Sequence, residues 1–336
     1  MKRWQFWLGI AISAIFLVLV LRGLDFAAFW REVQRANYWW LLPGVAIYFL
    51  AVWARAWRWH YLLRPLKQIS TATMFPIVAI GYMGNNIYPA RAGEVLRAAV
   101  LKRREGVSIS ASLATIIVER IFDGVVMLAF IFANLRDLAD LTGGSSVAAG
   151  LSIQQIALYG SFIFFGALLV FLMAAMFPTA SEKVLGILAE NLLPTRFRAR
   201  VLELGSRFLG GLESLRSPVE IFMVFITSVV IWLLETGKYW FVMQAFDFQV
   251  SYFALMLMNG VVNLATTIPS APGYLGTFDA PGIAVLVAYG VPQAVASSYT
   301  FVLHVALWLP ITALGAYYFV REGVRWTEVK AAERAA

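Results

Sequence analysis

The sequence of 336 residues contains no cysteine and only two histidines, His60 and His304. Without thiols the chain cannot form disulfides, iron–sulfur clusters or thiolate zinc sites. The two histidines are too few and too far apart in the sequence to indicate a metal centre. We therefore expect neither a metal nor any other cofactor.

Charged residues are also scarce. Asp, Glu, Lys and Arg make up 14% of the chain, while 61% is hydrophobic and the mean hydropathy is +0.75; soluble domains carry about 25% charged residues. Uncharged runs at Trp4–Leu21, Tyr38–Ala54 and Ile156–Phe177 reach or approach the length of about 20 residues that crosses a hydrocarbon core. The sequence predicts an all-α polytopic membrane protein.

The net charge of +8 comes mainly from segments that the positive-inside rule places in the cytoplasm, where they face anionic lipid headgroups. No basic patch lies in a soluble domain, so nucleic acid is not an expected partner. The expected partners are membrane lipids, with anionic headgroups at the cytoplasmic face. The sequence leaves the oligomeric state open, a homodimer included.

Basic residues also predict the topology. The first apolar run is longer than a signal-peptide core and no cleavage site follows it, so we interpret it as a retained span. Both flanks of Thr71–Leu101 are basic, which makes this segment a re-entrant hairpin that opens to the inside. The second broken run, Phe248–Phe278, has no Lys or Arg at its flanks and is expected to open to the outside. The prediction is a protein of the cell (inner) membrane with both termini cytoplasmic, two re-entrant helical hairpins and six transmembrane helices, near 4–21, 38–57, 107–134, 156–177, 219–246 and 293–320.

A long arginine-rich segment, about 181–217, separates the fourth and fifth predicted spans. Its apolar residues recur at steps of three and four, which predicts one amphipathic helix in the cytoplasmic interface. The alternative is a helix packed on another protein segment. The apolar stripe consists of Phe197, Val201, Leu204, Phe208, Leu212 and Leu215.

The two broken regions resemble each other. Pro89–Gly93 and Pro269–Gly273 share a Pro-x-x-x-Gly spacing at an offset of 180 residues, and a Gly-Val pair follows each, at Gly106 and Gly290, at an offset of 184. With the predicted topology, these matches indicate inverted repeats at about 38–134 and 219–320 within one integral membrane domain, 1–336. Inverted repeats with interrupted helices are typical of secondary transporters. A structural duplication without transport is the alternative.

The first hairpin carries Arg91, Glu94 and Arg97 at intervals of three. If a half-helix starts near Ala92, these residues lie along one side of it, and its N-terminal N–H groups form an anion site. The guanidinium of Arg91 suits a phosphate. The alternative is a capped turn in which Arg91 pairs only with Glu94.

The hairpin tips supply further candidate groups. Asn85 and Asn86 offer amide donors and acceptors at the first tip. The bent backbone of the hairpins is expected from Pro89, Gly93, Pro269, Pro272, Gly273 and Gly276. The second hairpin also carries a single carboxylate, that of Asp279.

Two predicted spans contain charges at mid-length. In the third, Glu119 and Asp123 share a helix face and Arg120 reaches Asp123, while the repeat aligns Arg120 with His304. Charges at this depth usually face a bundle interior and serve function. The alternative is a self-neutralising pair that holds helices together.

The fifth span repeats the i, i+3 spacing with Glu235 and Lys238. This pair can neutralise itself, which favours a structural role. Both residues are nevertheless kept with the charged residues above as candidates for substrate binding.

The stretches "GNNIYPARAGEVLRAAVLKRREGVS" and "ATIIVERIFDGVVML", with the later "IPSAPGYLGTFDA", are similar to the flippase-like membrane domain of the lysylphosphatidylglycerol synthase transmembrane family. That domain is the N-terminal half of MprF, the multiple peptide resistance factor. The resemblance covers nearly the whole chain and implies a lipid flippase or transporter. It marks as site candidates Asn85 or Asn86, Pro89, Arg91, Gly93, Glu94, Arg97, Glu119, Arg120 and Asp123.

One departure from the family pattern matters, and a second is mild. Only sixteen residues follow Val320, so we expect no aminoacyl-transferase half and no lipid lysinylation. Asp279 stands where the family has glutamate as often. The expected function is non-enzymatic movement of a phospholipid or glycolipid headgroup through a midplane site between the hairpins. The alternatives are a membrane-embedded transferase acting on a polyprenyl-phosphate lipid, and an accessory subunit of a lipid- or glycan-modifying enzyme.

Overall fold

The computed structural model describes residues 3–88, 91–134, 146–148, 151–152, 177–192, 194–268 and 270–323, with single positions between 162 and 176. Apart from a short antiparallel pair, β1 (Ser146–Ala148) and β2 (Leu151–Ser152), the described segments are helical. The α-helices are α1 (Arg3–Leu21), α2 (Phe26–Arg35), α3 (Leu41–Leu63), α4 (Thr71–Ile87), α5 (Ala92–Glu105), α6 (Ile109–Ala133), α9 (Pro178–Leu192), α10 (Thr195–Gly211), α11 (Pro218–Met243), α12 (Tyr252–Ala265), α13 (Asp279–Ala288) and α14 (Gln293–Arg321). The 3-10 turns are η1 (Tyr38–Trp40), η2 (Glu213–Arg216) and η3 (Pro272–Tyr274).

Three described helices, α3 with η1, α11 and α14, are long and apolar enough to cross a membrane, and α1 with α2 would make a fourth if that bent pair is one span. Helix α6 has 25 residues but carries Glu119, Arg120 and Asp123 at its middle. The predicted class, a helical protein with several membrane spans, is confirmed. The predicted span Ile156–Phe177 lies almost entirely outside the described residues.

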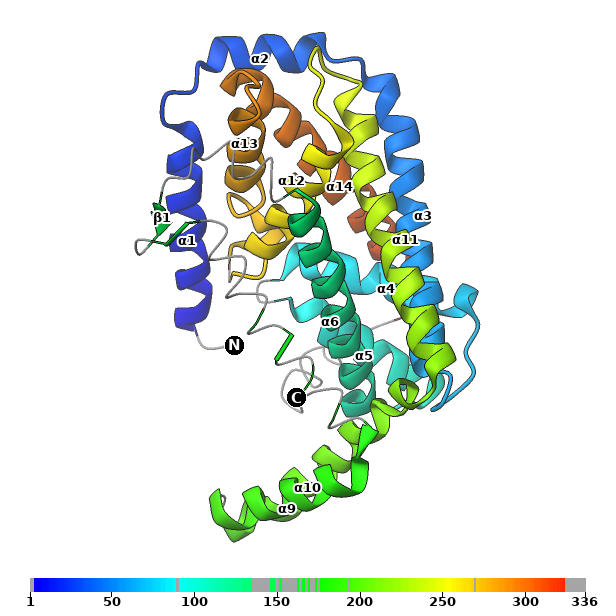
Figure 1. Ribbon diagram of the computed structural model, residues 1–336. Helices are drawn as coiled ribbons and strands as arrows, with labels where there is room; N and C mark the ends of the chain where they lie inside the picture. The colour runs from blue at the N-terminus through cyan, green and yellow to red at the C-terminus, as the bar shows by residue number, and fades with distance from the viewer. Residues whose placement is uncertain are drawn as a thin grey trace.

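Helix α2 lies across one end of the molecule, joined to α1 by a sharp turn (Figure 1). The two axes meet at 89°, and Gly23 supplies the left-handed backbone of the turn (φ 74°). Asp25 caps α2 by accepting hydrogen bonds from the N–H groups of Ala27 and Ala28. The Ala28 bond contributes most to holding the pKa of Asp25 below its usual value, so the cap stays charged.

Helices α4 and α5 form a hairpin that returns to the end of the molecule from which it starts. Ser70 caps α4, the helical hydrogen bonding stops at Tyr88, and α5 begins at Ala92, as the sequence predicted. Lys67, before α4, pairs with Glu105, the last residue of α5, at 2.9 Å. Helices α12 and α13 form a similar pair, interrupted around η3, and Val250 and Val291 at their outer ends pack in one apolar cluster.

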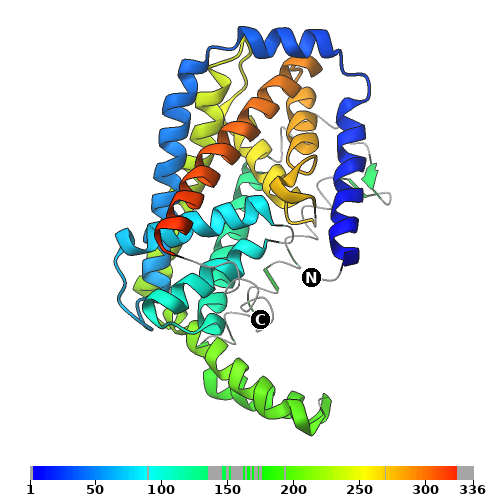
Figure 2. The same ribbon diagram turned by 180° about the vertical axis from the view of Figure 1, so that it is seen from behind.

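The helices α3–α6 and α11–α14 pack against each other in a reciprocal way. Helix α3 runs beside α11, with opposite direction, over their whole length (Figures 1 and 2). Helix α4 packs on α14, where a Cβ at Gly315 would lie 2.4 Å from the carbonyl oxygen of Ala79. Helix α6 packs on α12 through Met127, Phe130 and Met256. The tips of the two hairpins therefore meet near the middle of the bundle.

The segment expected to form one amphipathic helix is divided into two helices and a 3-10 turn. Pro194 precedes α10 with an extended backbone (ψ 143°), because a proline has no N–H to continue the α9 hydrogen bonds. Helices α9 and α10 project from the end of the bundle opposite α2 (Figure 1). The last part of the predicted stripe does pack on protein, since Leu212 and Leu215 are buried in the main apolar cluster.

Candidate functional site

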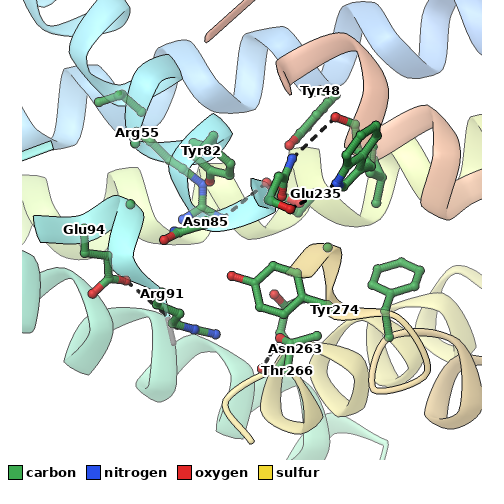
Figure 3. A pocket seen from close by; sticks show the side chains of 18 of the residues that line it. Tyr48, Arg55, Tyr82, Asn85, Arg91, Glu94, Glu235, Asn263, Thr266 and Tyr274 are labelled. Carbon is green, nitrogen blue, oxygen red and sulfur yellow. Dashed lines mark hydrogen bonds and ion pairs between the residues drawn. The ribbon is translucent and has the colours of Figure 1, made fainter. Parts of the chain in front are cut away.

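A cavity of about 150 Å³ lies where the two hairpin tips meet, enclosed by α3, α6, α11 and α14 (Figure 3); we call it the chamber. At about 30 Å³ per water, it has room for a group of about five water-sized atoms. Residues of both predicted repeats line it. The predicted site residues among them are Asn85, Asn86, Arg91, Gly93, Glu94, Arg97, Arg120, Glu235, Lys238, Gly273 and His304.

Other predicted site residues do not reach the chamber. Glu119 and Asp123 are fully buried behind its wall, because arginine side chains cover them. Asp279 and Pro272 line a neighbouring cavity instead, and the N–H of Gly276 donates to Asp279. Pro89 and Pro269 lie outside the described residues.

The start of α5 determines where the first hairpin presents its charges. Arg91 adopts a left-handed backbone (φ 54°) before Ala92, a conformation that costs a non-glycine residue energy. Its guanidinium lies 4.0 Å from Glu94, so the turn pair of the alternative interpretation is present. Both side chains are only half-buried and face the chamber, where Arg91 and Tyr274 lie on opposite sides (Figure 3).

Asp123 is the centre of a buried cluster behind the chamber. Arg58 Nη1 donates to Asp123 Oδ1 at 2.6 Å, and Trp232 Nε1 donates to the same oxygen at 2.9 Å. Arg120 lies 3.4 Å and Arg55 3.6 Å from the other carboxylate oxygen. The pair of Arg120 with Asp123 that the spacing predicted is present, and two arginines of α3 join it.

A second buried group lies on α11. Lys238 donates to Glu235 as the spacing predicted, and Arg55 donates to the other oxygen of Glu235 at 3.2 Å. Arg55 thus connects this group to Asp123. Its pattern in the sequence, "WARAWRW", has two arginines at i, i+3 between tryptophans, and that spacing was the available signal for the two buried arginines of α3.

Near Glu94 the network reaches the chamber surface. Arg120 Nε lies 3.5 Å from Glu94, and Arg97 donates to the buried Glu119 at 2.5 Å while its guanidinium covers the ring of Trp59. The full network joins six cations and four carboxylates, which leaves two positive charges uncompensated within it. Its members are Arg55, Arg58, Arg91, Arg97, Arg120 and Lys238 with Glu94, Glu119, Asp123 and Glu235.

Neutral polar groups complete the chamber wall, and the sequence reasoning missed most of them. Tyr82 lies beside Arg55, and Asn263 and Thr266 line the floor beneath Tyr274 (Figure 3). Seven buried side-chain atoms of chamber-lining residues, among them Asn85 Oδ1 and Arg91 Nε, have no hydrogen-bond partner among the described residues. Polar atoms of this kind are available to a ligand.

His304 connects the second hairpin to α14. Its Nδ1 lies 2.8 Å from Asp279 Oδ1 and its Nε2 lies 2.7 Å from the carbonyl oxygen of Gly273. The imidazole therefore ties the carboxylate at the start of α13 to the backbone of η3. Gly273 itself has a left-handed backbone (φ 74°) that brings its carbonyl to the imidazole.

Membrane-length helices around a buried, charged chamber define a polytopic membrane protein. The family described as "Lysylphosphatidylglycerol synthase TM region" matches residues 6–315, and the chain belongs to that family. The resemblance inferred from the hairpin motifs is confirmed.

Several curated proteins are similar to this chain. A UPF0104 membrane protein of Methanothermobacter thermautotrophicus is 24% identical, over 95% of this chain and 93% of its own length. A UPF0104 membrane protein of Pyrococcus horikoshii is 23% identical, over 91% and 93%. Glycosyltransferase AglD of Haloferax volcanii is 25% identical, and the match covers 71% of this chain and 42% of AglD. No solved structure matches the chain.

Proposed function

We propose that this protein moves a lipid with a phosphate-bearing headgroup across the membrane by passing the headgroup through the chamber. The observation that carries the proposal is the excess of two positive charges in a network that lines a buried cavity. Charges buried at this depth are costly and usually mark a substrate pathway. An anionic headgroup would supply the charge that the network lacks.

The reciprocal packing supports an inverted repeat, α3–α6 against α11–α14. Each unit has a long helix, a broken pair and a second long helix in the same order, and the broken pairs open to opposite ends. In secondary transporters with inverted repeats, the substrate site lies where the interruptions meet. Irregular backbone at that depth is tolerated because it is buried in protein or lines a wet cavity.

The basic residues support an orientation in which the α5 end faces the cytoplasm. Lys67 and Arg104 lie at this end, and Arg104 pairs with Glu322 beyond α14, which puts the start of the first hairpin and the end of α14 together. This orientation keeps both termini cytoplasmic. With the predicted span at 156–177, it would put α9 and α10 at the cytoplasmic interface.

Within the chamber, Arg91 and Arg120 would hold the phosphate, with help from the free N–H groups at the start of α5. Glu94 currently lies 4.0 Å from Arg91 and 3.5 Å from Arg120. A bound phosphate would replace Glu94 as the partner of both arginines. When the headgroup leaves, Glu94 would pair with both arginines again. Both cations would then have an anionic partner in the bound and in the empty chamber.

The relatives bear on the substrate class. The relative AglD is named as a glycosyltransferase, which supports a glycolipid, in which the phosphate carries a sugar. The same name favours a second candidate, a membrane-embedded transferase. No group of three or more His, Asp or Glu side chains that could hold a metal occurs in the described segments. Metal-dependent formation of product from a labelled lipid would favour the transferase over the flippase that we propose.

Arg91→Ala is expected to slow headgroup translocation in liposomes at least about tenfold, because a hydrogen bond to a charged group contributes about 1.5–3 kcal/mol. Arg91→Lys should keep part of the rate, since it keeps the charge and loses the planar fork. The translocation rate is measured from the share of a fluorescent lipid in the liposomes that is protected from a membrane-impermeant reductant. Arg31→Ala, on exposed α2, is the matched control. Equal rates for Arg91→Ala and the control would refute the chamber as the headgroup path.

A further inference from the structure

A second cavity, of about 650 Å³, adjoins the chamber between α1, α2, α13 and α14; we call it the lateral groove. Its size is within the range of about 300–1,000 Å³ typical of ligand sites. Eighteen residues line it, and most are aliphatic or aromatic. Its polar groups are confined to Asn86, Asp279, Ser297, His304 and the indole N–H of Trp308.

The groove and the chamber share one wall, made of Asn86, Gly273, His304 and Trp308. The polar groups of this wall bond to protein: Trp308 Nε1 donates to the carbonyl of Asn86 at 3.4 Å, and the Asn86 amide donates to Thr312 Oγ1 at 2.8 Å. His304 bonds to the Gly273 carbonyl. The two cavities therefore lie on either side of the same four residues.

Helix α1 forms the outer side of the groove. It is attached to the second hairpin by a hydrogen bond from the N–H of Ala271 to Ser13 Oγ at 2.8 Å. Leu17 of α1 and Ile283 of α13 line the groove from one side, and Val305 of α14 from the other. At the α2 end, Phe29 packs edge-on against Phe301, with ring centroids 5.8 Å apart.

We propose that the lateral groove binds a hydrocarbon chain of the lipid whose phosphate occupies the chamber. The inference rests on the proposed function for the identity of the headgroup, and on the shared wall for the adjacency of the two cavities. The complementarity is twofold, because the cationic chamber fits the phosphate and the apolar groove fits the chain attached to it.

The test uses phosphatidic acid with a diazirine in one acyl chain, in phosphatidylcholine vesicles containing the full chain. After illumination, mass spectrometry of the peptides locates the label. The expected labels lie on α1, α13 and α14, and Leu17→Trp should lower them about tenfold by filling the groove. Val305→Trp is a second variant at a half-exposed position, used if Leu17→Trp lowers the melting temperature. The matched control is Leu309→Trp, at a position that is 54% exposed and lines neither cavity.

A water-soluble ligand without a hydrocarbon chain tests the chamber separately from the groove. Binding of glycerol phosphate, followed by phosphorus NMR, should be the same in Leu17→Trp and in the unsubstituted protein, because the chamber is unchanged. Labels that survive both groove substitutions, or that gather around Leu309, would overturn the groove as a chain site even if translocation is observed. Groove labelling without any translocation would instead refute transport and leave the groove standing.

Discussion

Asp123→Asn is expected to lower the free energy of unfolding by about 3–5 kcal/mol, the cost of breaking a buried ion pair from one side. The substitution keeps the size of the side chain, so packing is unchanged. It removes the charge that faces Arg58, a fully buried side chain whose nearest carboxylate is Asp123. Arg55 and Arg120 lose part of their compensation at the same time.

The measurement is thermal or denaturant unfolding in detergent, with Glu322→Gln as the control. Glu322 pairs with Arg104 at the surface, at 2.9 Å, and exposed pairs contribute about 1 kcal/mol or less. The two substitutions make the same chemical change in different environments. If both lowered stability equally, Asp123 would not be the centre of a buried network.

Gly93→Ala is expected to separate α4 from α5 and abolish headgroup translocation. A Cβ at this position would lie 2.0 Å from the carbonyl oxygen of Gly81 and 2.4 Å from the backbone nitrogen of Asn85. Both are backbone atoms, so they cannot move without moving the helix. Such overpacking typically costs about 1–3 kcal/mol, and here it also displaces Arg91 and Glu94 from the chamber.

The direction in which Gly93→Ala changes the stability of the protein shows whether the position is closely packed. Alanine is about 1 kcal/mol better than glycine inside a helix, so the same substitution stabilises where there is space. Gly186→Ala on α9 provides that control, because nothing lies within 4 Å of its Cβ position. A raised melting temperature for Gly93→Ala would contradict the close packing of the first hairpin.

The sequence signals for the helix pair α4–α5 are local, whereas the re-entrant membrane topology of the hairpins stays a prediction. Basic residues on both flanks of Thr71–Leu101 implied a return to one side, and the pair of Lys67 with Glu105 has that geometry. The start of α5 followed from the helix-breaking residues before Ala92. The i, i+3 pairs of Arg120 with Asp123 and of Lys238 with Glu235 depend only on helical spacing, and both are present.

The rest depended on tertiary contacts that no local pattern contains. Arg58 and Asp123 are 65 residues apart in the sequence, so the buried cluster could not be read from spacing. Glu119 and Asp123 were expected to face a substrate, whereas arginines from other segments cover both. The second predicted span, near 38–57, ends just after Arg55, whereas α3 continues to Leu63 and buries that side chain within the helix. The lateral groove requires α1, α13 and α14 to come together.

A density map of the protein in lipid nanodiscs containing phosphatidic acid tests the central claim most directly. We expect a phosphate between Arg91, Arg120 and the Gly273 side of the chamber, with Glu94 displaced from both arginines. A chamber in which Arg91 and Arg120 keep Glu94 as their partner, while lipid is ordered only on the outer surface of the helices, would contradict it.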